Sequence, residues 1–344
     1  MVLRLLRSGW LPLLVALTGV LAYPNDAEAA GARKAAPAAK QAPARTAKSW
    51  SAPSRKVAVR RLSRVAYAPP PRPSFGAAYG LHRTDDPLDL ASGAAFVVDQ
   101  ESNEVLFSKN AQAVLPIASL TKLMSALVVA EAQLPLDEPL SISEEDIDTE
   151  KGSRSRLGVG TTLSRLDLMH LSLMASENRA AHALGRHYPG GLDAFVQAMN
   201  RKAAELGMRD TRFVEPTGLS SSNQSSARDL AVLVGEAHKH ELLRSLSTSP
   251  SYEVAVGERQ LQFRNTNRLV DNPTWQIGLQ KTGYISEAGR CLVMQAQLAG
   301  RKLIMVLLDS AGKYSRLGDA ERIRRWLSET APSIGQSRAA TPTS

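Results

Sequence analysis

Residues 116–132 read PIASLTKLMSALVVAEA, a mostly apolar segment that carries Ser119 and Lys122 near its start. From residue 120 to 132 the side chains are mainly good helix formers, which predicts a buried helix. Ser119 stands at the start of this helix, and Lys122 follows one turn later on the same face. A serine hydroxyl needs a base to take its proton, and a desolvated, neutral lysine amine can be that base. The segment therefore predicts a helix that presents an activated serine nucleophile.

Short strand patterns lie on both sides of a helical middle section. Residues 94–98 and 105–108 flank a polar turn, which predicts a hairpin. A helix at 164–175 opens with the cap pattern Ser164-x-x-Asp167. The remaining elements are expected to be helices at 192–206 and 228–237, strands at 276–282, 290–297 and 301–309, and a helix at 319–328. This order predicts an α/β (α+β) domain in which both chain ends build one antiparallel sheet flanked by helices, with an inserted all-helical subdomain.

Two further short motifs carry groups that could join Ser119 in catalysis. Residues 176–178 read SEN between two expected helices, and residues 281–283 read KTG on an expected strand. In the order Ser-x-x-Lys, Ser-x-Asn and Lys-Thr-Gly, they match the motif set of penicillin-binding proteins and serine β-lactamases, with Glu177 where the second motif of that set has Asp. The first motif also occurs at Ser310 and Lys313, but only Ser119 is followed by a helix that can hold its lysine. Together the three motifs favour acyl transfer at Ser119.

The sequence around these motifs resembles the low-molecular-mass penicillin-binding proteins, and most closely their D-alanyl-D-alanine endopeptidase branch, of the penicillin-binding protein seven type. The likeness runs from about residue 90 to 327 and includes SRSRLG at 153–158, PTGL at 216–219 and NTN at 265–267. It implies the β-lactamase/DD-peptidase fold and a serine enzyme that hydrolyses peptide cross-links in peptidoglycan. It also implies inhibition by β-lactam antibiotics, and a reaction that needs no metal or cofactor.

The resemblance also implies a role for each catalytic residue. Ser119 would be the acylated nucleophile and Lys122 its general base. Ser176 would relay the proton, while Asn178 would orient Lys122 and hold the substrate backbone. Lys281 would tune the site electrostatically, and its charge could also lower the pKa of Lys122 and steer an anionic substrate.

Substrate binding is expected along the KTG segment. By the same resemblance, Thr282 would bind the carboxylate of the substrate or a neighbouring amide. The backbone N–H groups of Ser119 and Tyr284 would form the oxyanion hole. Gly283 lies between Thr282 and Tyr284 in the same segment. These three residues, Thr282, Gly283 and Tyr284, are the predicted substrate-binding residues.

Three other functions stay open. A D-alanyl-D-alanine carboxypeptidase would use the same acylation, but its relatives commonly carry an extra C-terminal β-domain and membrane helix, for which the segment after residue 327 is too short. A class A β-lactamase would need a Glu-x-x-Leu-Asn loop, whereas residues 215–219 read EPTGL. An inactive peptidoglycan-binding module would not need the intact Ser119, Lys122 and Lys281. A Ser-His-Asp hydrolase is disfavoured because no Gly-x-Ser-x-Gly elbow occurs.

The first 29 residues have the pattern of a secretory signal peptide. Arg4 and Arg7 precede an apolar run at 10–21, and residues 27–29 read AEA, a small-x-small cleavage site. The apolar run is short for a membrane span. We therefore expect cleavage of residues 1–29 and export to the periplasm.

The positive charge of the chain is concentrated in residues 30–88, which are predicted to be a disordered, Ala/Pro-rich linker. Between Gly31 and Thr84 there are twelve Lys or Arg and no Asp or Glu, so the catalytic domain expected at 89–330 is not basic. Nucleic-acid binding is therefore not expected. The linker could associate loosely with the wall or a membrane surface, or act only as a spacer. A polar tail is expected at 331–344.

Overall fold

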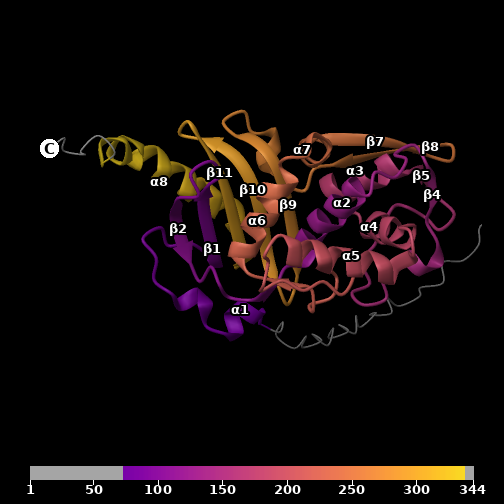
Figure 1. Cartoon of the computed structure of the whole chain (residues 1–344), viewed down its shortest axis with the longest axis horizontal. Coiled ribbons are helices and arrows are strands. Elements are labelled where there is room, and N and C mark those ends of the chain that lie inside the picture. Colours follow the sequence, from indigo (N-terminus) through magenta and orange to yellow (C-terminus); the bar gives the residue numbers. More distant parts are fainter. Residues whose placement is uncertain (1–72, 338–344) are drawn as a thin grey trace, which may run out of the picture. The chain divides into compact units, whose positions relative to one another are not determined.

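The computed structural model describes residues 73–337, with side chains described as far as residue 330 (Figure 1). The predicted signal peptide (1–29), residues 30–72 of the predicted linker and residues 338–344 of the predicted tail lie outside the described residues. In the part of the chain that is described, no helix is long and apolar enough to cross a membrane.

One five-stranded antiparallel sheet forms the centre of the domain, in the order β2-β1-β11-β10-β9. Its strands are β1 Ser92–Asp99, β2 Val105–Lys109, β9 Gln276–Ile285, β10 Gly289–Leu298 and β11 Arg301–Ser310. Strand β1 pairs with β11, so strands from the two ends of the described chain lie side by side at the centre of the sheet. The predicted architecture is confirmed, although β9 runs three residues past its predicted end.

Helices cover both faces of this sheet because β1, β10 and β11 are apolar on both sides. Helix α6, Ala227–Ala237, packs against β1 and β11 on one face, and helix α8, Ser315–Ser337, packs against β10 and β11 on the other (Figure 1). Helix α8 is longer than the predicted 319–328.

The helical section lies between β2 and β9 in the chain. Every residue of its central helix α2 from Thr121 to Val129 is buried, as the apolar segment predicted. Helix α3 begins where Ser164 and Asp167 form a complete capping box. The helices of this section are α2 Thr121–Glu131, α3 Arg165–Met174, α4 Asn178–Arg186, α5 Gly191–Glu205, α6 Ala227–Ala237 and α7 Glu241–Thr248. Short strands pair as β3 Leu115–Pro116 with β6 Gln224–Ser225, β4 Pro139–Ser141 with β5 Thr162–Ser164, and β7 Ser251–Val256 with β8 Arg259–Arg264.

The structure differs from the prediction at residues 73–88, which were expected to belong to a disordered linker. They contain helix α1, Phe75–Ala78, and a 3₁₀ turn at Leu81–Arg83. The reason is a set of contacts with distant residues: Ser74 Oγ donates to Asp309 at 2.7 Å, and Asn110 Nδ2 donates to the carbonyl oxygen of Leu81 at 3.0 Å. Composition alone does not reveal such contacts.

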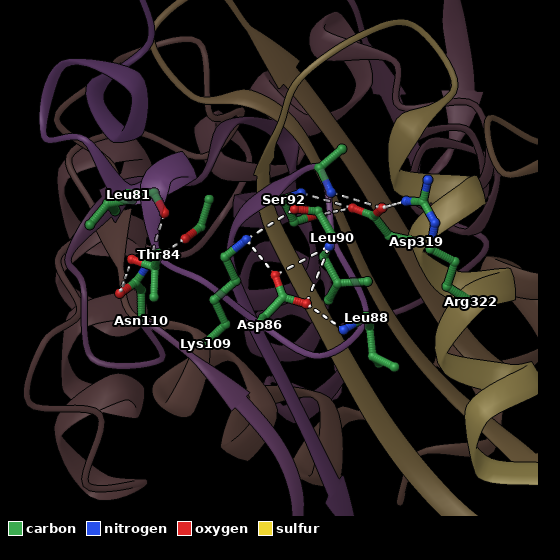
Figure 2. A network of polar contacts seen from close by, with 12 residues as sticks. Leu81, Thr84, Asp86, Leu88, Leu90, Ser92, Lys109, Asn110, Asp319 and Arg322 are labelled. Atoms are coloured by element: carbon green, nitrogen blue, oxygen red, sulfur yellow. Dashed lines mark hydrogen bonds and ion pairs between the residues drawn. The ribbon is translucent and has the colours of Figure 1, made fainter.

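A buried ion pair that joins this segment to β2 gives a prediction for stability (Figure 2). Lys109 Nζ lies 2.8 Å from Asp86 Oδ2, and the two side chains are only 2% and 5% exposed. Because Asp86→Ala leaves the ammonium buried without its partner, we expect the free energy of unfolding to fall by about 3 kcal/mol. Denaturant unfolding would measure this, with the exposed neighbour Asp85→Ala as control. Equal stability of the two variants would contradict the assigned role of the pair.

Candidate active site

Ser119 lies in the 3₁₀ turn Ala118–Leu120 that leads into α2, and Lys122 lies in the first turn of that helix. Lys122 is fully buried. Its Nζ lies 2.8 Å from Ser119 Oγ, 2.7 Å from Asn178 Oδ1 and 2.6 Å from the carbonyl oxygen of Thr217. A neutral amine has two hydrogens and one lone pair, and the amide and carbonyl oxygens accept both hydrogens. The lone pair is therefore left for the hydroxyl of Ser119.

Burial lowers the pKa of Lys122 from 10.5 to about 7, while Glu215, Glu177 and Asp148 act in the opposite direction. A large fraction of this amine is consequently neutral near pH 7. That is the protonation state that a general base requires.

Lys281 and Ser176 form a second polar pair beside the first. Lys281 Nζ donates to Ser176 Oγ at 2.9 Å and to the carbonyl oxygen of Thr282 at 2.8 Å. Burial holds the pKa of Lys281 well below its usual value, with repulsion from Lys122 and Arg316 adding to it. Of the two causes expected for a low pKa of Lys122, desolvation and the nearby charge of Lys281, burial is the main one, and it is also the main cause for Lys281.

Ser176 is held in an unusual backbone conformation between α3 and α4. Its φ is +61°, in the left-handed region that non-glycine residues seldom adopt. Such local strain persists only where surrounding contacts fix it, and it is frequent at functional sites. The turn directs Ser176 toward Lys281 and starts α4 at Asn178.

Asn178 connects Lys122 to a segment that we call the 148–157 loop. Its Oδ1 accepts from Lys122, and its Nδ2 donates to Ser153 Oγ at 2.8 Å, which fixes the orientation of the amide. An ion pair of 2.6 Å between Lys151 and Glu287 joins the same loop to the turn between β9 and β10. The loop therefore connects the helical section to the sheet beside the catalytic groups.

Strand β9 brings Thr282, Gly283 and Tyr284 next to Ser119. A Cβ on Gly283 would lie 3.1 Å from Ser119 N, so the two backbones approach each other closely. Thr282 Oγ1 donates to Thr266 Oγ1 at 2.7 Å, and the side chain of Tyr284 is exposed under the guanidinium of Arg290. Among the described strands β9 is the last in the sheet, so its outer edge can pair with an extended peptide.

Two charged residues of the site carry no short motif and were not identified from the sequence. Arg316, at the start of α8, has buried Nε and Nη1 atoms with no hydrogen-bond partner among the described residues. It lies near enough to Lys281 for their charges to interact. Two buried guanidinium nitrogens without partners are costly and suit an anion that arrives with the substrate.

Glu215 is the second of these residues, and its role is to hold a loop in place. Its carboxylate accepts from the backbone N–H groups of Thr217 and Gly218, each at 2.6 Å, and from Asn223 Nδ2 at 2.7 Å. These bonds fix the carbonyl of Thr217 that contacts Lys122. Residues 216–219 were recognised in the sequence only as part of the family resemblance.

Known proteins resemble this chain in sequence and fold. The D-alanyl-D-alanine carboxypeptidase family, peptidase S11, matches residues 81–312. Over 241 residues the chain is 51% identical to a D-alanyl-D-alanine endopeptidase of Pseudomonas aeruginosa and 46% identical to one of Escherichia coli, covering 70% of this chain and 78% of each relative. A solved Streptomyces DD-transpeptidase matches with a TM-score of 0.64 at 26% identity, over 69% of this chain and 97% of that chain. The chain therefore belongs to the D-alanyl-D-alanine carboxypeptidase family of serine peptidases.

Proposed function

We propose that this protein hydrolyses peptide cross-links of peptidoglycan beside a D-alanine, through an acyl-enzyme on Ser119. The proposal rests on the position of the Lys122 amine, 2.8 Å from Ser119 Oγ and hydrogen-bonded to two fixed acceptors. Because the pKa of Lys122 is about 7, its neutral form can take the serine proton near neutral pH. The two relatives of 51% and 46% identity are named endopeptidases, which favours cross-link cleavage over carboxypeptidase activity.

In the first step, the hydroxyl proton of Ser119 passes to Lys122 as Oγ bonds to the carbonyl carbon. The backbone N–H groups of Ser119 and Tyr284 stabilise the charge that develops on the carbonyl oxygen. Ser176 relays the proton to the leaving amine while the carbon–nitrogen bond breaks. Water then attacks the ester carbon and loses a proton to Lys122, and Ser119 leaves with a proton restored.

The peptide is held along the outer edge of β9. Thr282 and Arg316, whose Nε and Nη1 have no hydrogen-bond partner in the described part of the chain, bind the carboxylate that follows the scissile bond. Asn178 positions Lys122 through its Oδ1, and its Nδ2 keeps a second hydrogen for the substrate backbone.

Glu215 argues against a β-lactamase. A β-lactamase of class A needs a carboxylate that activates water to remove the acyl group. Glu215 is close to Lys122, but both of its oxygens already accept hydrogen bonds that hold its own loop. A β-lactam therefore stays attached to Ser119 and inhibits the enzyme.

The protein acts outside the cytoplasm, where its substrate lies. Residues 1–29 direct export to the periplasm and are removed, and the basic residues between 31 and 72 can rest on anionic wall polymer or lipid headgroups. The mass of the exported protein gives the cleavage site directly.

The test is the mass of the intact protein after incubation with penicillin, followed by digestion to locate the adduct. We expect one stable adduct on Ser119, and faster hydrolysis of a cross-linked peptide dimer than of a single peptide ending in two D-alanines. An adduct on another residue, or none, would contradict the proposal. A preference for the single peptide would instead identify a carboxypeptidase.

A further inference from the structure

A cavity lies at the end of β9 that carries Tyr284. Its volume is about 530 Å³, within the range of pockets that hold a small ligand or short peptide. Tyr284 and Arg290 line it from the side of β9 and β10, and His82 and Arg83 line it from the segment that follows α1. Tyr284 follows Gly283, whose backbone approaches Ser119, so the cavity lies at the end of the strand that borders the catalytic serine.

Positive charge dominates the rim of this cavity. Arg83, Arg290 and Lys313 line it, and none of the three makes an ion pair with a carboxylate in residues 73–330. The one lining carboxylate, Asp309, is buried, accepts from Ser74 Oγ and lies 3.2 Å from His82 Nε2. Among the described residues, the three cations that line the cavity therefore have no carboxylate partner, as expected for a site that receives carboxylates.

The N-terminal wall of the cavity is held in place before any ligand binds. The backbone N–H of Phe75 donates to the carbonyl oxygen of Glu287 at 2.9 Å, joining α1 to the β9–β10 turn. Figure 2 shows the contacts that hold the residues after α1, in which Asn110 binds Leu81 and Lys109 binds Asp86. A pre-formed wall lowers the entropic cost of binding.

We propose that this cavity binds carboxylates of the second peptide of a cross-linked substrate, the peptide that is released when Ser119 is acylated. The inference rests on the proposed function and deepens it, because it explains how one site distinguishes a cross-link from a single peptide. A terminal D-alanine ends at the carboxylate-binding groups of the catalytic site, whereas a cross-linked peptide continues beyond them. The cavity gives that continuation a complementary, cationic surface.

The test compares a cross-linked peptide dimer with a single peptide ending in two D-alanines. In the double variant Arg83→Ala/Lys313→Ala we expect KM for the dimer to rise about tenfold, with kcat and the KM for the single peptide unchanged. Wild-type enzyme should show the same rise in KM when the carboxylates of the second peptide are amidated. The variant Arg83→Lys/Lys313→Arg should restore binding of the unmodified dimer.

Lys239→Ala is the matched control, because this exposed lysine lies on α6's C-terminal side and does not line the cavity. Unchanged KM for the dimer in the double variant, or an equal rise for both substrates, would overturn the inference. Acylation by penicillin distinguishes this failure from failure of the proposed function. If the enzyme forms the Ser119 adduct and cleaves the dimer, but KM for the dimer does not depend on Arg83 and Lys313, the proposed function holds and the subsite does not exist.

Discussion

Replacing Lys122 by arginine is expected to slow acylation of Ser119 by about a thousandfold, within the range for loss of a general base. Arginine keeps a positive charge at every accessible pH and cannot accept the serine proton. It is also too large for a site in which Nζ already contacts three oxygens and the side chain is fully buried. The measurement is the second-order rate constant for labelling by a fluorescent penicillin.

The pH dependence of the wild-type enzyme follows from the same residue. Burial lowers the pKa of Lys122 to about 7, so the amine is mostly protonated below this pH and mostly neutral above it. Only the neutral form can take a proton, and the rate of acylation should therefore rise through about pH 7 and level off at higher pH. A rate that falls over this interval would show that the charged form of Lys122 is the active one.

A control separates chemistry from folding. Lys302→Arg makes the same substitution at an exposed lysine that pairs with Glu101, and should be acylated like wild type. Lys122→Met removes the base without enlarging the side chain, and we expect it to be as inactive as Lys122→Arg. If either Lys122 variant reacts at the wild-type rate, the assigned base is wrong.

The sequence predicted those features that depend on neighbouring residues. The cap pattern of Ser164 and Asp167 placed the start of α3, and the apolar run after Ser119 placed α2 in the core. The three motifs could be predicted to form one site because each lies at the end of a helix or on a strand whose hydrophobic pattern is clear from the sequence.

What the sequence did not predict depends on contacts between distant residues. Residues 73–88 have the composition of a linker, but Asp309, far along the chain, accepts a hydrogen bond from Ser74. Arg316 belongs to no motif, and its importance is visible only because two of its buried donors lack a hydrogen-bond partner among the described residues. The carboxylate of Glu215 resembles a catalytic group in isolation, whereas its hydrogen bonds give it a structural role.

Gly218→Ala is expected to damage the site although residue 218 takes no part in the chemistry. Gly218 has φ +82°, and a Cβ there would overlap the carbonyl group of Ala118 and lie 2.8 Å from Ser119 N. The clash is with backbone atoms, which cannot rotate away, so the turn that carries Ser119 must move. Since a displacement of about 1 Å can cost a hundredfold in rate, we expect at least that loss in acylation by penicillin.

Gly207→Ala distinguishes the effect of this clash from the free-energy cost of an alanine in the left-handed backbone conformation. Gly207 has a similar φ of +72°, but a Cβ there would meet no described atom within 4 Å. Its substitution should therefore lower the free energy of unfolding by about 1 kcal/mol and leave acylation unchanged. Gly218→Ala should lose both stability and acylation, because the same backbone contact supports the loop of Glu215 and positions Ser119. Equal rates of acylation in the two variants would show that the close contact between residues 118 and 218 does not position Ser119.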